Sequence, residues 1–287
     1  MKFGVHVSKA GGFRNALREA IELQCDTIQV FSGNPRTLRQ PKIDEDDVSA
    51  FRQGLDKESI GPLVIHAPYL LNLASPKETT YELSVNALAD EITRCRILGA
   101  DYLVFHPGNH VGSGIEAGIK RIADAINKAC DMADLTGESG LVLLLEMVSG
   151  AGTEIGWTFE QQKAIMGLAK DVPLGICLDT CHMFTAGHNI VTMEGLDEAL
   201  KELDQILGIS SVGIVHANDA VGGLGSRLDR HTDIGKGMIG EEGFRVILGN
   251  SMLRKIPFIL ETPKNGLEDD MRNLATIRRL AQEAVIW

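Results

Sequence analysis

The sequence predicts a single α/β domain, residues 1–287, folded as a parallel (β/α)8 TIM barrel. Eight short apolar runs recur along the chain, and segments with the apolar spacing of helices lie between them. Seven of the eight runs also end in histidine, aspartate or glutamate. Such endings are expected where all strand ends meet on one functional face. A doubly wound open sheet is the main alternative fold.

The predicted strands are rich in β-branched and other apolar residues, as strands buried on both faces are. In chain order they are residues 3–8 (FGVHVS), 27–31 (TIQVF), 62–67 (PLVIHA), 102–107 (YLVFHP), 141–147 (LVLLLEM), 174–180 (LGICLDT), 212–219 (VGIVHAND) and 257–262 (PFILET).

Helical patterns separate these strands. The clearest cover residues 11–25, 84–100, 118–137 and 195–209, and several are followed by a glycine that can end a helix. No linker rich in proline, glycine or serine divides the chain. The repeated unit is therefore a strand followed by a helix, within one domain.

The composition limits the possible functions. With 28 basic and 39 acidic residues the net charge is −11, so binding to nucleic acid through overall basicity is not expected. The five cysteines form no CxxC pair, which favours reduced core thiols in a cytosolic protein. The N-terminus does not resemble a signal peptide, and no apolar run approaches the ~18 residues of a membrane span.

The strand ends supply candidate metal ligands. They are His6, His66, His106, Glu146, Asp179, His216 and Glu261. Three further candidates lie close to these strand ends: His182, and Asp229 and His231 of the DRH motif. We expect His6 to be the least secure ligand, since it can instead hydrogen-bond to one. His110 and His188 are expected to belong to loops. The remaining nine ligands are too many for one ion and suggest two or three.

Imidazole and carboxylate ligands without cysteine suit zinc or manganese. Adjacent ions of this kind generate hydroxide near neutral pH and stabilise both the attacking and the leaving oxygen of a displacement at phosphorus. The ligand set therefore predicts hydrolysis of a phosphoester.

Residues around the same strand ends suggest how a polyanion binds. The loops there carry the basic residues Arg36, Arg39, Arg227, Arg230 and Lys236. Together they place positive charge where the metals are expected, on an otherwise acidic protein. Tyr69 and Leu70 follow His66 and form an apolar wedge that can enter a base stack.

With these motifs in hand, the chain resembles endonuclease IV, the zinc-dependent apurinic/apyrimidinic (AP) endonuclease family of DNA base excision repair. The resemblance extends from residue 3 to residue 262. The pieces that carry it are HAPYLLNLA, FHPGNH, GICLDTCHMFTAG, HANDA, GSRLDRH, IGKGMIG and ILET.

The resemblance implies three zinc ions per chain, with manganese possible at one or more positions. One ion is held by His66 and His106, and Glu146 bridges it to a second ion held by Asp179, His216 and Glu261. His182, Asp229 and His231 hold the third. Glu146 and Glu261 are the expected catalytic residues.

The implied reaction is attack by a metal-bridging hydroxide on the phosphate 5′ to an abasic site in duplex DNA. It leaves a 3′-hydroxyl and a 5′-deoxyribose phosphate, and blocked 3′ ends are trimmed as well. Arg36, Tyr69 and Leu70 enter the duplex while the abasic nucleotide flips into the pocket, and Arg227 and Arg230 also contact the DNA. We expect a monomer, cytoplasmic and nucleoid-associated when acting on DNA.

Two other functions are weighed against this one. A metal-dependent sugar isomerase or epimerase on a similar barrel predicts only four or five ligands and leaves the set His182, Asp229 and His231 unexplained. A protein that binds abasic sites without cutting them has no need of so complete a ligand set.

Overall fold

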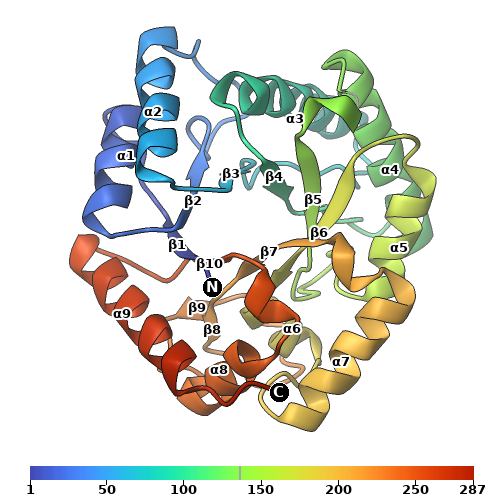
Figure 1. Cartoon of the computed structure of the whole chain (residues 1–287). Coiled ribbons are helices and arrows are strands. Elements are labelled where there is room, and N and C mark those ends of the chain that lie inside the picture. Colours follow the sequence, from blue (N-terminus) through green and yellow to red (C-terminus); the bar gives the residue numbers. More distant parts are fainter. Residues whose placement is uncertain (136) are drawn as a thin grey trace.

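Eight parallel strands close into a barrel in the computed structural model, which describes residues 1–135 and 137–287, and this confirms the predicted fold (Figure 1). Around the barrel the order is β1-β10-β7-β6-β5-β4-β3-β2. The strands are β1 (Phe3–His6), β2 (Thr27–Phe31), β3 (Leu63–His66), β4 (Tyr102–Phe105), β5 (Val142–Glu146), β6 (Leu174–Asp179), β7 (Val212–His216) and β10 (Phe258–Leu260).

The helices lie around these strands (Figure 1). They are α1 (Phe13–Glu22), α2 (Glu45–Glu58), α3 (Glu78–Leu98), α4 (Ile115–Met132), α5 (Phe159–Leu168), α6 (Thr180–Ala186), α7 (Met193–Ile206), α8 (Gly240–Gly249) and α9 (Leu267–Glu283). All of them except α6 form an outer ring (Figure 1). Short 3-10 turns lie at Gly137–Ser139, Ile209–Ser211 and Leu253–Lys255. None of the described helices is long and apolar enough to cross a membrane.

Three features differ most from the sequence-based expectation. Helix α4 covers Ile115–Met132 where residues 118–137 were predicted, a range that includes residue 136, outside the described part of the chain. Helix α3 begins at Glu78 rather than near residue 84, because the buried Tyr81 packs in its first turns and donates a 2.6 Å hydrogen bond to Asp124 of α4. Beyond β7, the loop contains an unpredicted antiparallel hairpin of β8 (Asp219–Ala220) and β9 (His231–Thr232). Segments of two residues carry no alternation pattern by which a strand can be recognised.

The core has two parts, as strand alternation requires. Inside the barrel lie Val64, Val104, Leu144, Cys177, Ile214 and Ile259, while the larger part fills the layer between strands and helices. All five cysteines are buried and unpaired. Burial raises the pKa of Cys25, Cys130 and Cys177 to about 12, so these are inert core thiols, as expected.

The backbones of β1 and β2 approach each other so closely at Gly4 that no side chain fits there, whereas Gly167 in α5 has open space around it. A Cβ at Gly4 of β1 would lie 1.7 Å from the carbonyl oxygen of Thr27 on the paired strand β2, whereas one at Gly167 of α5 meets nothing within 4 Å. We predict that Gly4→Ala lowers the free energy of unfolding by about 3 kcal/mol or more. Gly167→Ala, the control, should raise it by about 0.5–1 kcal/mol. Urea unfolding checks both, and equal effects would contradict the register.

Candidate active site

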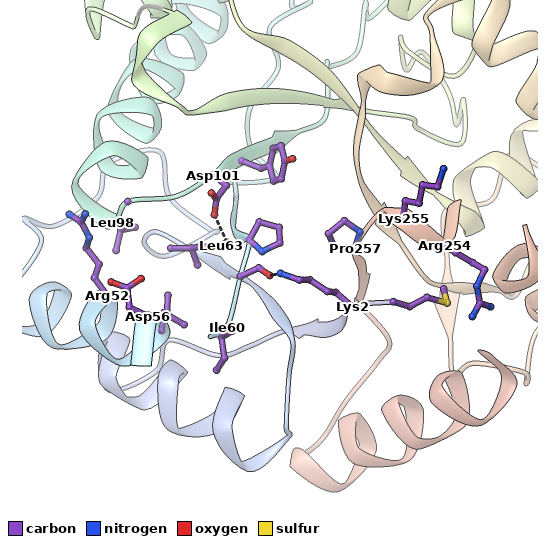
Figure 2. Close-up of a pocket in the computed structure, with 16 residues that line it drawn as sticks. Lys2, Arg52, Asp56, Ile60, Leu63, Leu98, Asp101, Arg254, Lys255 and Pro257 are labelled. Carbon is purple, nitrogen blue, oxygen red and sulfur yellow. Dashed lines mark hydrogen bonds between the residues drawn. The ribbon is translucent and has the colours of Figure 1, made fainter. Parts of the chain in front are cut away.

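The predicted ligands converge at the carboxyl end of the barrel. Glu146, Asp179 and His216 are the last residues of their strands, as is His66 of β3, and His106 and Glu261 directly follow β4 and β10. Parallel register carries all these ends to one rim. The opposite end is different, because it holds a cavity of about 790 Å³. Figure 2 shows the residues that line it, which lie at or near strand starts, among them Lys2, Leu63, Asp101 and Pro257. None of the predicted site residues lines that cavity.

Three groups of side chains have the spacing of a metal site, with ligand atoms within 4.8 Å of one another in each. They are His66, His106 and Glu146; Glu146, Asp179, His216 and Glu261; and His182, Asp229 and His231. All nine predicted ligands are included. Asp179 and His231 also form a fourth group with Cys181. The Cys181 thiol already has a partner, because its sulfur lies 3.8 Å from the carbonyl oxygen of Arg230 and can donate a weak hydrogen bond to it.

Glu146 connects the first two groups. Its Oε2 lies 3.2 Å from Nε2 of both His66 and His106, and its Oε1 lies 3.1 Å from Nδ1 of His216. A carboxylate whose two oxygens face different ligand groups has the arrangement of a bridging ligand. In the third group, Nε2 of His182 lies 3.1 Å from Asp229 Oδ1.

Hydrogen bonds fix which nitrogen each imidazole turns to its group. Nδ1 of His66 donates to the carbonyl of Ala67 at 2.7 Å, and Nδ1 of His182 donates to that of Met147 at 2.8 Å. Both leave Nε2 free for a metal. Nε2 of His182 and of His231 are indeed buried without a hydrogen-bond partner among the described residues. Orphaned nitrogens aimed at a carboxylate fit a cation between them.

Buried charge is balanced by protons in the absence of a cation. Burial alone would raise the pKa of Glu146, but His216 and His106 hold it well below its usual range. Burial alone would lower the pKa of His182, but Asp179 and Asp229 raise it well above its usual range. Metal ligation needs neutral imidazoles and ionised carboxylates, so a divalent ion would take the place of these protons.

Two further polar residues, which sequence reasoning did not single out, support the ligands. Nε2 of the buried Gln29 donates to Glu261 Oε1 at 2.6 Å, and its Oε1 accepts from His216 Nε2 at 2.8 Å. Asn218 donates to Asp179 Oδ2 at 2.6 Å and accepts from the Glu261 amide at 2.8 Å. A glutamine inside the apolar run TIQVF was the one available signal for Gln29.

The other histidines have separate roles. His6 belongs to none of the metal-spaced groups, and its Nδ1 lies 2.9 Å from Gln29 Nε2 and 3.5 Å from Glu261 Oε1. His110 Nδ1 accepts from two glycine amides of its own loop, and the His188 ring packs on Phe159. His6 thus supports a candidate ligand, while the latter two shape loops.

A rim of exposed side chains surrounds the ligands. Tyr69 and Leu70 are 60% and 51% exposed, and the Tyr69 ring packs edge-on against Phe31 with the ring centroids 5.3 Å apart. The basic residues Arg36, Arg39, Arg227, Arg230 and Lys236 are also exposed, and none forms an ion pair with a described residue. Arg227 stacks on Trp157, its guanidinium carbon 4.2 Å from the ring centroid. Sequence reasoning missed this tryptophan.

The loop that carries Asp229 and His231 is anchored by one buried carboxylate. Asp219 at the start of β8 accepts hydrogen bonds from the amides of Gly237, Ile239 and Gly240. These bonds close residues 219–240 into a compact excursion, and β9 returns His231 to the barrel rim.

Comparison with known proteins places the chain among related barrels. A family model described as a xylose isomerase-like TIM barrel matches residues 17–282. The chain is 46% identical over 279 residues to the probable endonuclease 4 of Methanoculleus marisnigri, covering 97% of this chain and 98% of that one. It is 40% identical over 281 residues to the probable endonuclease 4 of Halothermothrix orenii, covering 97% and 100%.

Two solved structures are similar to this chain over nearly its whole length. The crystal structure of endonuclease IV from Thermus thermophilus matches with a TM-score of 0.87 and 38% identity, over 99% of this chain and 100% of that one. A D-tagatose 3-epimerase-like protein matches with a TM-score of 0.73 at 23% identity, over 99% and 98%. At that identity the second match shows a shared fold only.

Gln29 provides a test of the ligand support. We predict that Gln29→Leu weakens metal retention about tenfold or more, since it removes the partners of both His216 and Glu261. Metal content after dialysis against graded chelator measures this. Thr27→Val on the same strand, which loses only a hydrogen bond to the Pro62 carbonyl, is the control. Equal retention in both variants would show that Gln29 does not support the ligands.

The proton balance predicts a pH dependence. The pKa values of His106, His182 and His216 are raised in the metal-free protein. Their stabilisation is fully present below the unfolded-state pKa of about 6.5 and is lost as pH rises through the folded values. The metal-free protein should therefore lose thermal stability above about pH 6.5, and the increase in Tm on adding zinc should grow over the same interval. An increase independent of pH would contradict this.

Proposed function

Because the chain belongs to the endonuclease IV family, and is thus an AP endonuclease of DNA repair, we propose that it hydrolyses the phosphodiester bond 5′ to abasic sites in duplex DNA. The products are a 3′-hydroxyl and a 5′-deoxyribose phosphate. The same chemistry trims blocked 3′ ends. The observation that carries this proposal is the third ligand group, His182, Asp229 and His231, beside the two groups that share Glu146.

The family is metal-dependent, and the clustered ligands fit divalent cations. The proposed complement is three zinc ions per chain, with manganese possible at one or more positions. Ions bound there supply hydroxide as the nucleophile near neutral pH and neutralise charge on the phosphate oxygens. The residues of the three groups described above would hold these ions, and Glu146, which belongs to two of the groups, would serve both.

Among the carboxylates at the strand ends, Glu261 is the one best placed to act on the substrate. Its side chain is 13% exposed, whereas Glu146, Asp179 and His216 are at most 1% exposed. The hydrogen bond from Gln29 orients one oxygen of Glu261, and the other lies 3.2 Å from His216 Nδ1. Glu261 thus orients the attacking water, while Glu146 holds the two adjoining groups together. These are the two catalytic residues of the proposal.

DNA is recognised by the rim. Arg36, Tyr69 and Leu70 enter the duplex and replace the flipped abasic nucleotide in the stack. Flipping costs little for a nucleotide that has lost its base, which selects the lesion without reading sequence. Arg227 and Arg230 bind backbone phosphates, and their positive charge offsets the net charge of −11 at this face. The enzyme works as a monomer, cytoplasmic and at the nucleoid when bound to DNA.

A sugar isomerase or epimerase is the competing activity on this barrel. The likeness to epimerase structures extends to the fold alone. Isomerisation at a carbonyl needs one or two ions, and the group formed by His182, Asp229 and His231 would then have no task. The relatives described above that share more than a third of their sequence with this chain are named probable endonuclease 4 or endonuclease IV.

Metal content and cleavage of a defined lesion test the proposal together. The substrate is a duplex with one tetrahydrofuran abasic analogue, which cannot undergo β-elimination, so a cut 5′ to it means hydrolysis. We expect about three zinc or manganese ions per chain and a 5′ cut that chelation abolishes and zinc restores. The undamaged duplex is the control. One or two ions and an intact tetrahydrofuran duplex would reject the proposal and direct the search to sugars.

A further inference from the structure

A buried charged cluster lies outside the metal-binding groups. Helix α3 places Glu91 and Arg94, 1% and 5% exposed, against the loop that follows β2. Burying such groups is costly unless each finds partners. Neither belongs to a metal-spaced group, so the reaction described above gives them no task.

The Arg94 guanidinium holds both ends of that loop, residues 32–41. Its Nη2 donates to the carbonyl of Ser32 at 2.7 Å and its Nη1 to the carbonyl of Pro41 at 2.9 Å. Its Nε donates to the Ser32 hydroxyl at 2.8 Å, and that hydroxyl donates to Glu91 Oε2 at 2.6 Å. Each of the three guanidinium nitrogens of Arg94 thus donates a hydrogen bond to one end of the loop.

The loop is also tied together internally. The Gln40 side chain donates to the carbonyls of Asn34 and Thr37 at 2.9 and 2.7 Å, and it accepts from the Asn34 amide at 2.7 Å. The Arg36 amide donates to the Asn34 side chain at 3.0 Å. Arg36 itself is exposed. A closed loop anchored at both ends therefore presents two exposed arginines, of which Arg36 lies near its middle and Arg39 near its second anchored end.

We propose that Arg94 is a positioning residue for DNA recognition, which fixes the 32–41 loop and so sets the approach of Arg36 before DNA binds. The inference rests on the proposed contact of Arg36 with DNA. A loop that is ordered before DNA binds loses little conformational entropy on binding, so its order should increase the affinity for DNA. Lysine cannot replace the fork, because one ammonium cannot span two separate carbonyls in a fixed plane.

The metal ligands lie on other strand ends, so the cleavage step should be spared. Among the described residues, the hydrogen bonds of Arg94 go to Ser32 and Pro41, and none reaches a candidate metal ligand. Arg96 on the same helix offers a matched control, since it is exposed and its one hydrogen bond to the described residues goes to the Ala133 carbonyl.

The test compares Arg94→Lys and Arg94→Met with Arg96→Lys and Arg96→Met in the metal-loaded enzyme. For the Arg94 variants we expect about tenfold faster amide hydrogen exchange in residues 33–40 and about a tenfold higher KM for the tetrahydrofuran duplex. Metal content and kcat should stay within about twofold of the parent enzyme, since the ligands are untouched. The Arg96 variants should match the parent in all four measurements. If Arg94→Met does not fold, Arg94→Lys decides.

A double-mutant cycle separates this inference from the function on which it rests. Arg36→Ala should itself raise KM, and adding Arg94→Met should then raise it less than about twofold, because both act through one loop. Unchanged exchange and unchanged KM in the Arg94 variants, with Arg36→Ala impaired, would overturn the positioning role alone. A normal KM in Arg36→Ala would instead overturn the DNA contact. Fully additive effects would show that Arg94 acts elsewhere.

Discussion

The buried carboxylate of Glu146 is the constraint on which the rest of the site depends. Its two oxygens face different histidines, His66 and His106 on one side and His216 on the other. A charge at 1% exposure is tolerable only if cationic partners surround it on both sides, and those partners come from three other strand ends. The parallel register of a closed barrel is what supplies them, so the fold and the ligand geometry depend on each other.

Much of the fold and of the ligand set could be predicted from the sequence, since both depend on the spacing of apolar residues and on the residue that ends each apolar run. An apolar run that ends in a ligand, repeated around a barrel, places the ligand on one known face. That is why His66, Glu146, Asp179 and His216 were expected together. Gln29 was not, because a single polar residue in a strand shows neither its direction nor its partners. The β8–β9 hairpin and the contacts of Arg94 depend on backbone atoms far apart in sequence, which no side-chain pattern records.

Backbone atoms also govern the tautomers of the ligands. His66 and His182 each donate to a main-chain carbonyl, of Ala67 and Met147 respectively. The acceptor is therefore kept whatever side chain stands at residues 67 and 147, and the strand ends themselves hold the rings in place. His216 differs, since its outer nitrogen depends on the side chain of Gln29. A substitution of Gln29 can therefore change the orientation of the His216 ring directly.

The loop from β8 to the start of α8 is structurally separate from the closed barrel. Asp229 and His231 enter the site on an excursion of about twenty residues held by Asp219, and the barrel closes without it. Such an excursion can be lengthened, exchanged or lost while the eight strands and the ligands at their ends persist. Asp229 and His231 therefore depend on this excursion, whereas His182, the other member of the third ligand group, stands on α6 directly after β6. The third ligand group thus joins a residue of the barrel itself to two residues of a separable loop.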